Sequence, residues 1–305
     1  MSFLVELPPA QYNPNAFANF NSASGDFDID VARAMMWMSQ LAYETHVPKT
    51  ITAVSGLWTL SNVKPLIQPA KSTLPVSDTR GVIAQRNGAT IIAFAGTDPL
   101  ILKNWVSDFY LGRPKGDVHQ GFEDAAAAVW DDVRTALIAA SAAGSPIFIT
   151  GHSLGAALAV VTADRARSEP GIARPQVYLY GCPRVCGVDA AATYNAALGP
   201  TTYRLVHGND IVPTVPPPQL GFHHVGRYLA CGPGAKFVAG QLALNSNSDE
   251  PLPTTGGFAG IAQQLANLVV GFSPSQRMDV IGRLSELLLP GISDHLPDRY
   301  YDALT

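Results

Sequence analysis

Charged side chains are scarce in this sequence, and their scarcity excludes a class of partner. Charged residues make up 14% of the 305 residues, and the formal net charge is −4. A protein that binds nucleic acid needs a basic stripe to neutralise phosphates, and this chain has no excess of Lys and Arg to build one. We therefore expect no nucleic-acid partner, whereas an uncharged substrate is compatible with the composition.

Long apolar runs and a leader of the secretory type are also missing. A membrane-spanning helix needs about eighteen or more consecutive apolar residues, and no such run occurs. Residues 1–13 lack a basic region, and their apolar run stops at Val5, which is not typical of a secretory signal. These two absences lead us to expect a cytoplasmic protein.

Cysteine is rare. The three cysteines, Cys182, Cys186 and Cys231, cannot all pair with one another, and the odd count favours free thiols. Cys182 and Cys186 together with a histidine could hold zinc, but no second pair has metal-ligand spacing, so this interpretation is the weaker one. We expect no metal site and no cofactor.

The strongest pattern that is present lies in residues 145–167. Residues 147–150 are apolar and β-branched and predict a buried strand, and the Ala-rich residues 154–167 predict a helix. Between them, residues 151–155 read GHSLG, a G-x-S-x-G element with the strand before it and the helix after it that such an element needs. The free N–H groups at the start of that helix face the place where an oxyanion would form. Ser153 is therefore the candidate nucleophile.

The order of the other elements predicts an α/β fold. Asn87-Gly88 suits a type I′ turn between the apolar runs 81–86 and 89–95, so the sheet begins antiparallel. Strands and helices then alternate from residue 89 to 212, which is typical of a mostly parallel sheet flanked by helices. Strands are expected at 177–180, 202–207 and 222–229, helices at 26–44 and 122–140, and mostly irregular chain at 47–78 with a short strand near 57–60.

A serine nucleophile needs a base, and the base needs an acid that fixes its tautomer. In chains of the α/β-hydrolase type the order is Ser, then Asp or Glu, then His, which leaves His223, His224 and His295. We favour His295 because it follows a Pro-Gly break on an expected loop, whereas His224 lies in an expected strand and suits a structural hydrogen bond. Asp210, just past a strand end, is favoured over Asp189 at an expected helix cap.

Two further segments bear on the site. Thr97 follows the strand at 89–95, where its hydroxyl and its N–H could both point at a reacting carbonyl, although it could also be an ordinary turn residue. The next segment, about 98–110, carries the apolar residues Leu100, Ile101 and Trp105 and is expected to be either a lid or a buried helix. Residues of about 256–290 form two apolar helical stretches, expected to be a helical insertion packed on one domain that covers 1–305.

Several motifs, taken together and in order, resemble the class 3 lipase family, the α/β-hydrolases related to fungal triacylglycerol lipases. They read FAGT at 94–97, NWVSD at 104–108, VHQGF at 118–122, GHSLGA at 151–156, YGCPR at 180–184 and HGNDIVP at 207–213. Asp294-His295 near the C-terminus adds to them. The resemblance covers about residues 30–230, and the interval between Asp210 and His295 is longer than in the compact fungal members.

This resemblance implies Ser153 as nucleophile, Asp210 as acid and His295 as base. It also implies an oxyanion hole made by Thr97 and the backbone N–H of Leu154, and a mobile lid after Thr97. The implied activity is hydrolysis of carboxylic esters, with lipid esters such as acylglycerols as substrates and transient contact with a lipid interface. The alternatives are a phospholipase or acyltransferase with the same triad, and a non-catalytic lipid-binding protein on the same fold.

Overall fold

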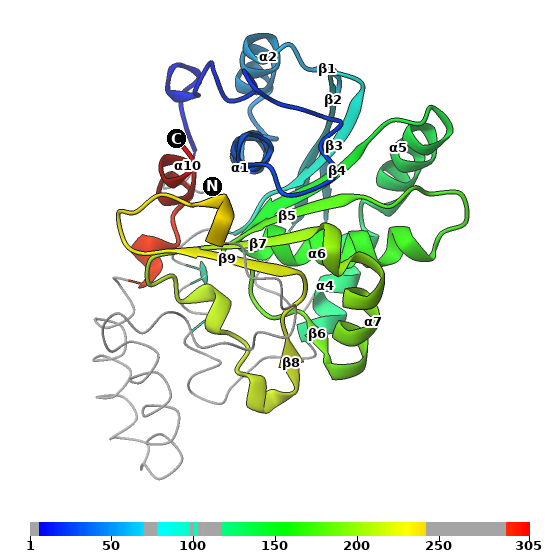
Figure 1. The fold of residues 1–305 in the computed structure, drawn as a ribbon. Helices are drawn as coiled ribbons and strands as arrows, with labels where there is room; N and C mark the ends of the chain where they lie inside the picture. Colours follow the sequence, from blue (N-terminus) through cyan, green and yellow to red (C-terminus); the bar gives the residue numbers. More distant parts are fainter. Residues whose placement is uncertain (1–5, 70–77, 98–100, 103–105, 107–117, 242–290) are drawn as a thin grey trace.

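A seven-stranded sheet runs through the centre of the molecule (Figure 1). The computed structural model describes residues 6–69, 78–97, 101–102, 106, 118–241 and 291–305. In spatial order the strands are β1 (Ser61–Pro69), β2 (Asp78–Arg86), β3 (Ala89–Phe94), β4 (Ile147–His152), β5 (Gln176–Tyr180), β7 (Thr202–His207) and β9 (Arg227–Cys231). The pairs β1–β2 and β2–β3 are antiparallel, and the remaining pairs are parallel. The antiparallel start and the parallel remainder predicted from the sequence are confirmed.

Helices cover both faces of this sheet, as Figure 1 shows. One face is covered by α1 (Ile29–Ala42), α2 (Pro48–Leu57) and α10 (Pro297–Ala303). The other is covered by α4 (Val118–Ala127), α5 (Trp130–Ala142), α6 (Leu154–Ser168) and α7 (Val188–Leu198). A two-stranded sheet pairs β6 (Cys186–Gly187) with β8 (Phe222–His223). The short 3₁₀ helices are η1 (Pro9–Gln11), η2 (Gly199–Thr201), η3 (Val212–Thr214), η4 (Pro218–Leu220) and η5 (Ala239–Gln241).

Helix α1 lies deep in the molecule. The Asp28 carboxylate caps its start by accepting from the N–H groups of Asp30 and Val31 at 2.8 and 3.2 Å. The sequence predicts an amphipathic helix, but nearly every residue from Val31 onward is buried. The N-terminal segment explains the difference, because its aromatic rings, such as Tyr12 at 5.7 Å from Trp37, pack on the side that was expected to face solvent.

The hairpin between β2 and β3 has the predicted turn. Arg86 pairs with Ala89, and the two residues between them, Asn87 and Gly88, have φ values of 49° and 76°. Positive φ at both central positions defines a type I′ turn, which Asn-Gly favours because both residues tolerate the left-handed conformation. This turn fixes the register of β3, whose C-terminal end leads to Thr97.

Three sequence predictions about secondary structure are wrong in detail. Residues 47–78 are not mostly irregular, because they contain α2 and the edge strand β1. Pro48 occupies the first position of α2, where proline is favoured, and Pro65 and Pro69 lie in an edge strand, which tolerates them. The long helix expected at 122–140 is broken at Val129 into α4 and α5, and the strand expected at 222–229 is split into β8 and β9.

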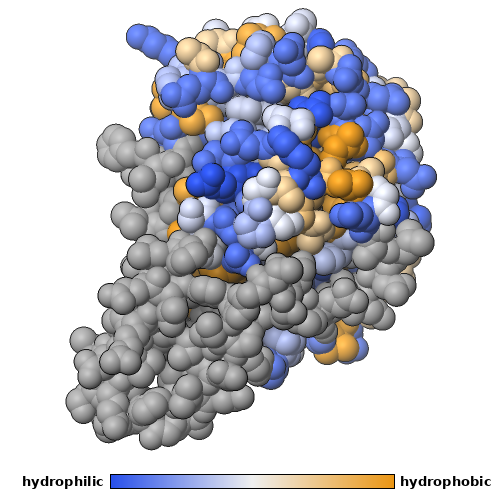
Figure 2. Space-filling view, turned by 60° about the vertical axis from the view of Figure 1, so that its left-hand side comes forward, coloured by the Kyte–Doolittle hydropathy of each residue, from blue (hydrophilic) through white to orange (hydrophobic). Residues whose placement is uncertain are grey.

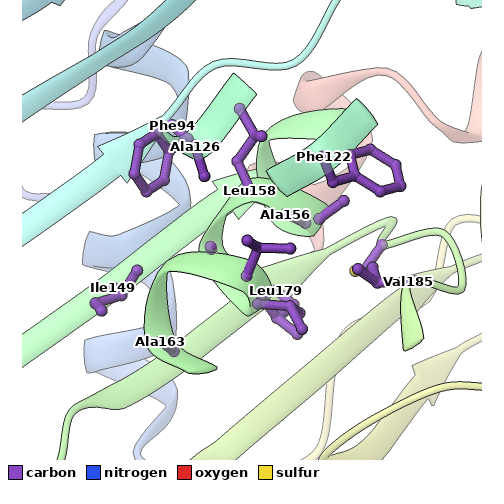
Figure 3. Packing of buried hydrophobic residues seen from close by; sticks show 14 of the residues in the cluster. Phe94, Phe122, Ala126, Ile149, Ala156, Leu158, Ala163, Leu179 and Val185 are labelled. Carbon is purple, nitrogen blue, oxygen red and sulfur yellow. The ribbon is translucent and has the colours of Figure 1, made fainter. Parts of the chain in front are cut away.

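Small side chains let α6 pack closely on the sheet. Ala156 and Ala163 are fully buried, and Figure 3 shows them with Leu158 beside the sheet residues Phe94, Ile149 and Leu179. Alanine leaves room for the helix axis to approach the strands, and the larger side chains fill the space around it. This packing fixes the start of α6 against the C-terminal ends of β3 and β4.

Large apolar side chains are exposed at scattered positions: Leu57, Ile67, Ile101, Ile138, Val188, Leu220 and Val238. On the face drawn in Figure 2, hydrophobic residues form a small group within mostly hydrophilic surroundings. Exposed apolar residues of this kind are normal for a protein surface. Among the helices that the structure describes, none has both the length and the apolar composition needed to cross a membrane.

Candidate active site

Ser153 lies on a strained turn between β4 and α6. Its backbone has φ 61° and ψ −131°, a conformation that residues other than glycine rarely adopt. The flanking glycines are required by space, because a Cβ at Gly151 would collide with the carbonyl of Gly155, and a Cβ at Gly155 would collide with the carbonyl of Phe94. The Ser153 N–H donates to the carbonyl of Tyr180 at 2.9 Å. The turn therefore has the geometry of the predicted nucleophile elbow.

Asp210 and His295 form a buried pair. His295 Nδ1 lies 2.7 Å from Asp210 Oδ2, and both side chains are at most 1% exposed. The hydroxyl of Tyr300 donates to the same carboxylate oxygen at 2.5 Å, and the N–H of Val212 donates to Oδ1 at 2.8 Å. Because a carboxylate accepts hydrogen bonds, His295 donates from Nδ1, and in the neutral imidazole Nε2 is then free to accept a proton.

The two atoms that remain to complete a serine triad are both buried. Ser153 Oγ and His295 Nε2 have no hydrogen-bond partner within the part of the chain that the structure describes. Buried polar atoms in a native protein are normally paired, so an unpaired hydroxyl and an unpaired ring nitrogen need an explanation. Catalytic hydrogen bonds are often long or poorly aligned without substrate, which explains both atoms at once.

Gly181, at the end of β5, is the residue against which the acid–base pair packs. A Cβ at this position would lie 2.6 Å from Asp210 Oδ2 and 2.7 Å from His295 Cε1. Its φ of 56° also favours glycine. The ends of β4, β5 and β7 thus bring Ser153, Asp210 and His295 to one edge of the parallel sheet, where sites of α/β folds assemble.

Thr97 and Leu154 are the two predicted oxyanion donors, and each is next in sequence to a residue at the elbow or in contact with it. A Cβ at Gly96 would lie 2.8 Å from Ser153 Cβ, so the residue before Thr97 touches the nucleophile. Leu154 is the first residue of α6, and its N–H is one of the helix donors without an intrahelical acceptor. Both residues are buried, at 7% and 1% exposure. The residue before Thr97 and the first residue of α6 thus both adjoin Ser153, and the oxyanion role of Thr97 and Leu154 stays a prediction.

The alternative candidates for the base and the acid have other environments. His224 Nε2 donates to the carbonyl of Pro213 at 2.9 Å, as expected for a structural histidine. His223 pairs with Cys186 between β6 and β8, and Asp189 lies in the first turn of α7. Tyr300 was missed by sequence reasoning, because a tyrosine five residues after a histidine has many ordinary explanations.

Sequence expectations about a lid and an insertion fall largely outside the described residues. Leu100, Trp105 and the stretch 256–290 lie there. Of the candidate lid residues, Ile101 is described and is 45% exposed, whereas its neighbours Leu102 and Val106 are buried in the core.

The three cysteines are free and buried. Burial raises the pKa of Cys186 to about 12, so its thiol stays protonated. Among the described residues, no group of three or more His, Cys, Asp and Glu side chains could hold a metal ion.

Two buried histidines make the stability of the fold depend on pH. Burial lowers the pKa of His152 and of His224 well below the ordinary value of 6.5. Below about pH 6.5 the unfolded chain therefore binds more protons than the folded chain. The contribution of these two histidines to the free energy of unfolding is complete above that pH and is lost as the pH falls.

Replacing His224 should reduce this pH dependence. His224→Gln keeps a donor for the carbonyl of Pro213 but cannot titrate. Between about pH 7.5 and 5.5 the free energy of unfolding should therefore fall by roughly 1.4 kcal/mol more in wild type than in the variant. Urea unfolding of both proteins at both pH values measures this difference. The contributions of the carboxyl groups are the same in both proteins and cancel in the comparison. Equal losses would show that His224 is not held neutral.

Comparisons with known proteins agree with this geometry. The model of the family described as Lipase (class 3) matches residues 91–220. The chain is 34% identical over 151 residues to secreted mono- and diacylglycerol lipase 1 of Fusarium solani, covering 47% of this chain and 44% of the relative. It is 32% identical over 197 residues to secreted mono- and diacylglycerol lipase A of Penicillium cyclopium, covering 58% and 63%. Over these residues the chain is similar to class 3 lipases.

A solved structure supports the same fold. A triacylglycerol lipase whose catalytic centre is formed by a serine protease triad superposes with a TM-score of 0.54 at 25% identity, covering 78% of this chain and 96% of that one. The α/β-hydrolase fold expected from the sequence is therefore confirmed. The matched stretches span 44% and 63% of the two relatives, or about half of their length.

The cytoplasmic location expected from the sequence is contradicted. The relatives from Fusarium solani and Penicillium cyclopium are both named as secreted lipases, which disagrees with that expectation. The composition of residues 1–13, on which the expectation depended, therefore does not decide the compartment.

Proposed function

We propose that this protein is a serine hydrolase of carboxylic esters. The observation that carries the proposal is the Asp210–His295 hydrogen bond of 2.7 Å together with the unpaired, buried Oγ of Ser153 on a strained elbow. An ester hydrolase needs a nucleophile that is exposed to its base and not committed to another hydrogen bond. The same arrangement in the proposed single domain over 1–305 favours catalysis over a non-catalytic lipid-binding role.

The proposed reaction proceeds through an acyl-enzyme. His295 Nε2 takes the proton from Ser153 Oγ as that oxygen attacks the ester carbonyl, and Asp210 stabilises the resulting imidazolium. The N–H groups of Thr97 and Leu154 donate to the tetrahedral oxyanion. When the oxyanion collapses, the alkoxide leaves with the proton from His295. A water molecule then gives its proton to His295 and attacks the acyl-enzyme, which releases the carboxylic acid and returns the proton to Ser153.

We infer that the substrates are lipid esters such as acylglycerols, met at a lipid interface. The names of the relatives, mono- and diacylglycerol lipases, support this substrate class. The segment at about 98–110 is proposed as a lid that covers the site between reactions. This lid would open when its apolar side chains can contact lipid, because their burial in lipid offsets the cost of leaving the protein.

A series of esters tests the substrate class. Hydrolysis of nitrophenyl esters of increasing acyl length, of mono- and diacylglycerols, and of phosphatidylcholine is compared at matched concentrations. We expect mono- and diacylglycerols to be cleaved and phosphatidylcholine to be cleaved at least about tenfold more slowly, a difference of about 1.4 kcal/mol in the barrier. Faster cleavage of phosphatidylcholine would identify a phospholipase, and transfer of the acyl chain to an alcohol in preference to water would identify an acyltransferase.

A further inference from the structure

Two buried side chains outside the triad, Tyr43 and His152, lie between the loops that carry the proposed catalytic groups. His152 Nε2 is 2.7 Å from the main-chain carbonyl oxygen of His295, and His152 Nδ1 is 2.9 Å from the hydroxyl of Tyr43. A carbonyl oxygen can only accept, so the ring proton of His152 is on Nε2. The neutral ring therefore accepts at Nδ1 from the Tyr43 hydroxyl.

The hydroxyl of Tyr43 extends this series of hydrogen bonds to Gly96. The backbone N–H of Gly96 donates to the Tyr43 hydroxyl, and a Cβ at Gly96 would collide with that hydroxyl. Gly96 immediately precedes Thr97, one of the proposed oxyanion donors. A continuous hydrogen-bond chain thus runs from Gly96 through Tyr43 and His152 to the main chain of His295. Both side chains are at most 2% exposed, so water does not compete for these hydrogen bonds.

A neutral His152 is compatible with its position beside His295. Its ring lies 4.5 Å from the ring of His295 and 5.6 Å from that of Tyr300, and burial together with the neighbouring His295 lowers the pKa of His152 well below its ordinary value. A charged ring here would oppose the proton that His295 takes up during the reaction. A neutral His152 holds the main chain of His295 without that repulsion.

We propose that Tyr43 and His152 are positioning residues, which hold the main chain at Gly96 and His295 in fixed places relative to Ser153. This inference rests on the proposed function and deepens it. Neither residue touches the substrate or moves a proton of the reaction. Their loss would let the main chain shift at Gly96, next to Thr97, and at His295. A misplacement of about 1 Å costs roughly a hundredfold in rate. The effect should therefore fall on the chemical step, not on substrate binding.

Removing the Tyr43 hydroxyl is the first test. Tyr43→Phe should lower kcat on a short, soluble nitrophenyl ester by about tenfold to a hundredfold, while KM changes less than about threefold. Tyr194→Phe is the matched control, because Tyr194 is also fully buried with one hydrogen bond, to Thr202 at 3.0 Å, and lies in α7. The control should change kcat less than about twofold. Equal kcat losses in the two variants would overturn the positioning role.

Rescue at position 152 separates positioning from general support of the fold. His152→Gln keeps an N–H that can donate to the carbonyl of His295, whereas His152→Leu does not. We expect the Gln variant to retain at least about tenfold more kcat than the Leu variant at the same KM. Equal kcat in the two would contradict the inference.

The failure of this inference is distinguishable from the failure of the proposed function. Ser153→Ala is assayed beside the other variants on the same ester. If Ser153→Ala abolishes hydrolysis while Tyr43→Phe behaves like Tyr194→Phe, the inference fails and the proposed function stands. If Ser153→Ala keeps wild-type hydrolysis, the proposed function fails, and the inference fails with it.

Discussion

Ser153→Ala should lower ester hydrolysis on the order of a million-fold, by analogy with serine hydrolases in which the nucleophile was removed. The expectation follows from the elbow, where the strained backbone of Ser153 presents a buried hydroxyl that has no hydrogen-bond partner among the described residues. Alanine fits the space of serine, so the fold should be retained. Steady-state hydrolysis of a soluble nitrophenyl ester gives the rate, and thermal unfolding checks the fold.

A matched serine controls this experiment. Ser168 is exposed near the end of the same helix, α6, and its hydroxyl makes a local bond to the carbonyl of Asp164. Ser168→Ala should hydrolyse the ester within about twofold of wild type. Substantial hydrolysis that persists in Ser153→Ala and is not explained by contaminating enzyme would contradict the assignment of the nucleophile.

Asp210→Asn should lower kcat on the order of ten thousand-fold, again by analogy with serine hydrolases. The carboxylate accepts from His295 Nδ1 at 2.7 Å and so keeps the proton on that nitrogen. An amide can instead donate to Nδ1, which puts the ring proton on Nε2 and leaves His295 unable to accept from Ser153. The residual rate should rise with pH because hydroxide can partly replace the base.

The rival acid supplies the control for this variant. Asp189, in the first turn of α7, was the alternative weighed from the sequence. Asp189→Asn should keep hydrolysis within about twofold of wild type, with a small loss of stability because an acidic side chain suits a helix N-terminus. If Asp189→Asn lost far more activity than Asp210→Asn, the assignment of Asp210 as the acid would be wrong.

The nucleophile elbow was predictable because its constraints are local. Gly151, Ser153 and Gly155 are needed within one turn, and the adjacent strand and helix are coded by runs of β-branched and Ala-rich residues. Asp210 was predictable for a related reason, since it lies three residues beyond the end of the buried strand β7. Residues that carry chemistry at the end of a strand leave a pattern in the sequence that periodicity can locate.

The partners of the site were not predictable, because contacts distant in sequence make them. Tyr300 reaches Asp210 across ninety positions, and Tyr43 reaches His152 across 109. In the sequence neither tyrosine belongs to a motif that indicates a role at the site. The prediction of mostly irregular chain at 47–78 was wrong for another reason. The prolines there are as compatible with a helix start and an edge strand as with a loop.

Covalent labelling tests the central claim most directly. A nitrophenyl alkylphosphonate mimics the tetrahedral state of ester hydrolysis and forms a bond only with an activated nucleophile. Intact-mass and peptide analysis of the labelled protein should show one adduct per chain, on Ser153, with loss of ester hydrolysis in proportion to labelling. An adduct on another residue, or full hydrolysis by protein that is completely labelled at Ser153, would contradict the account.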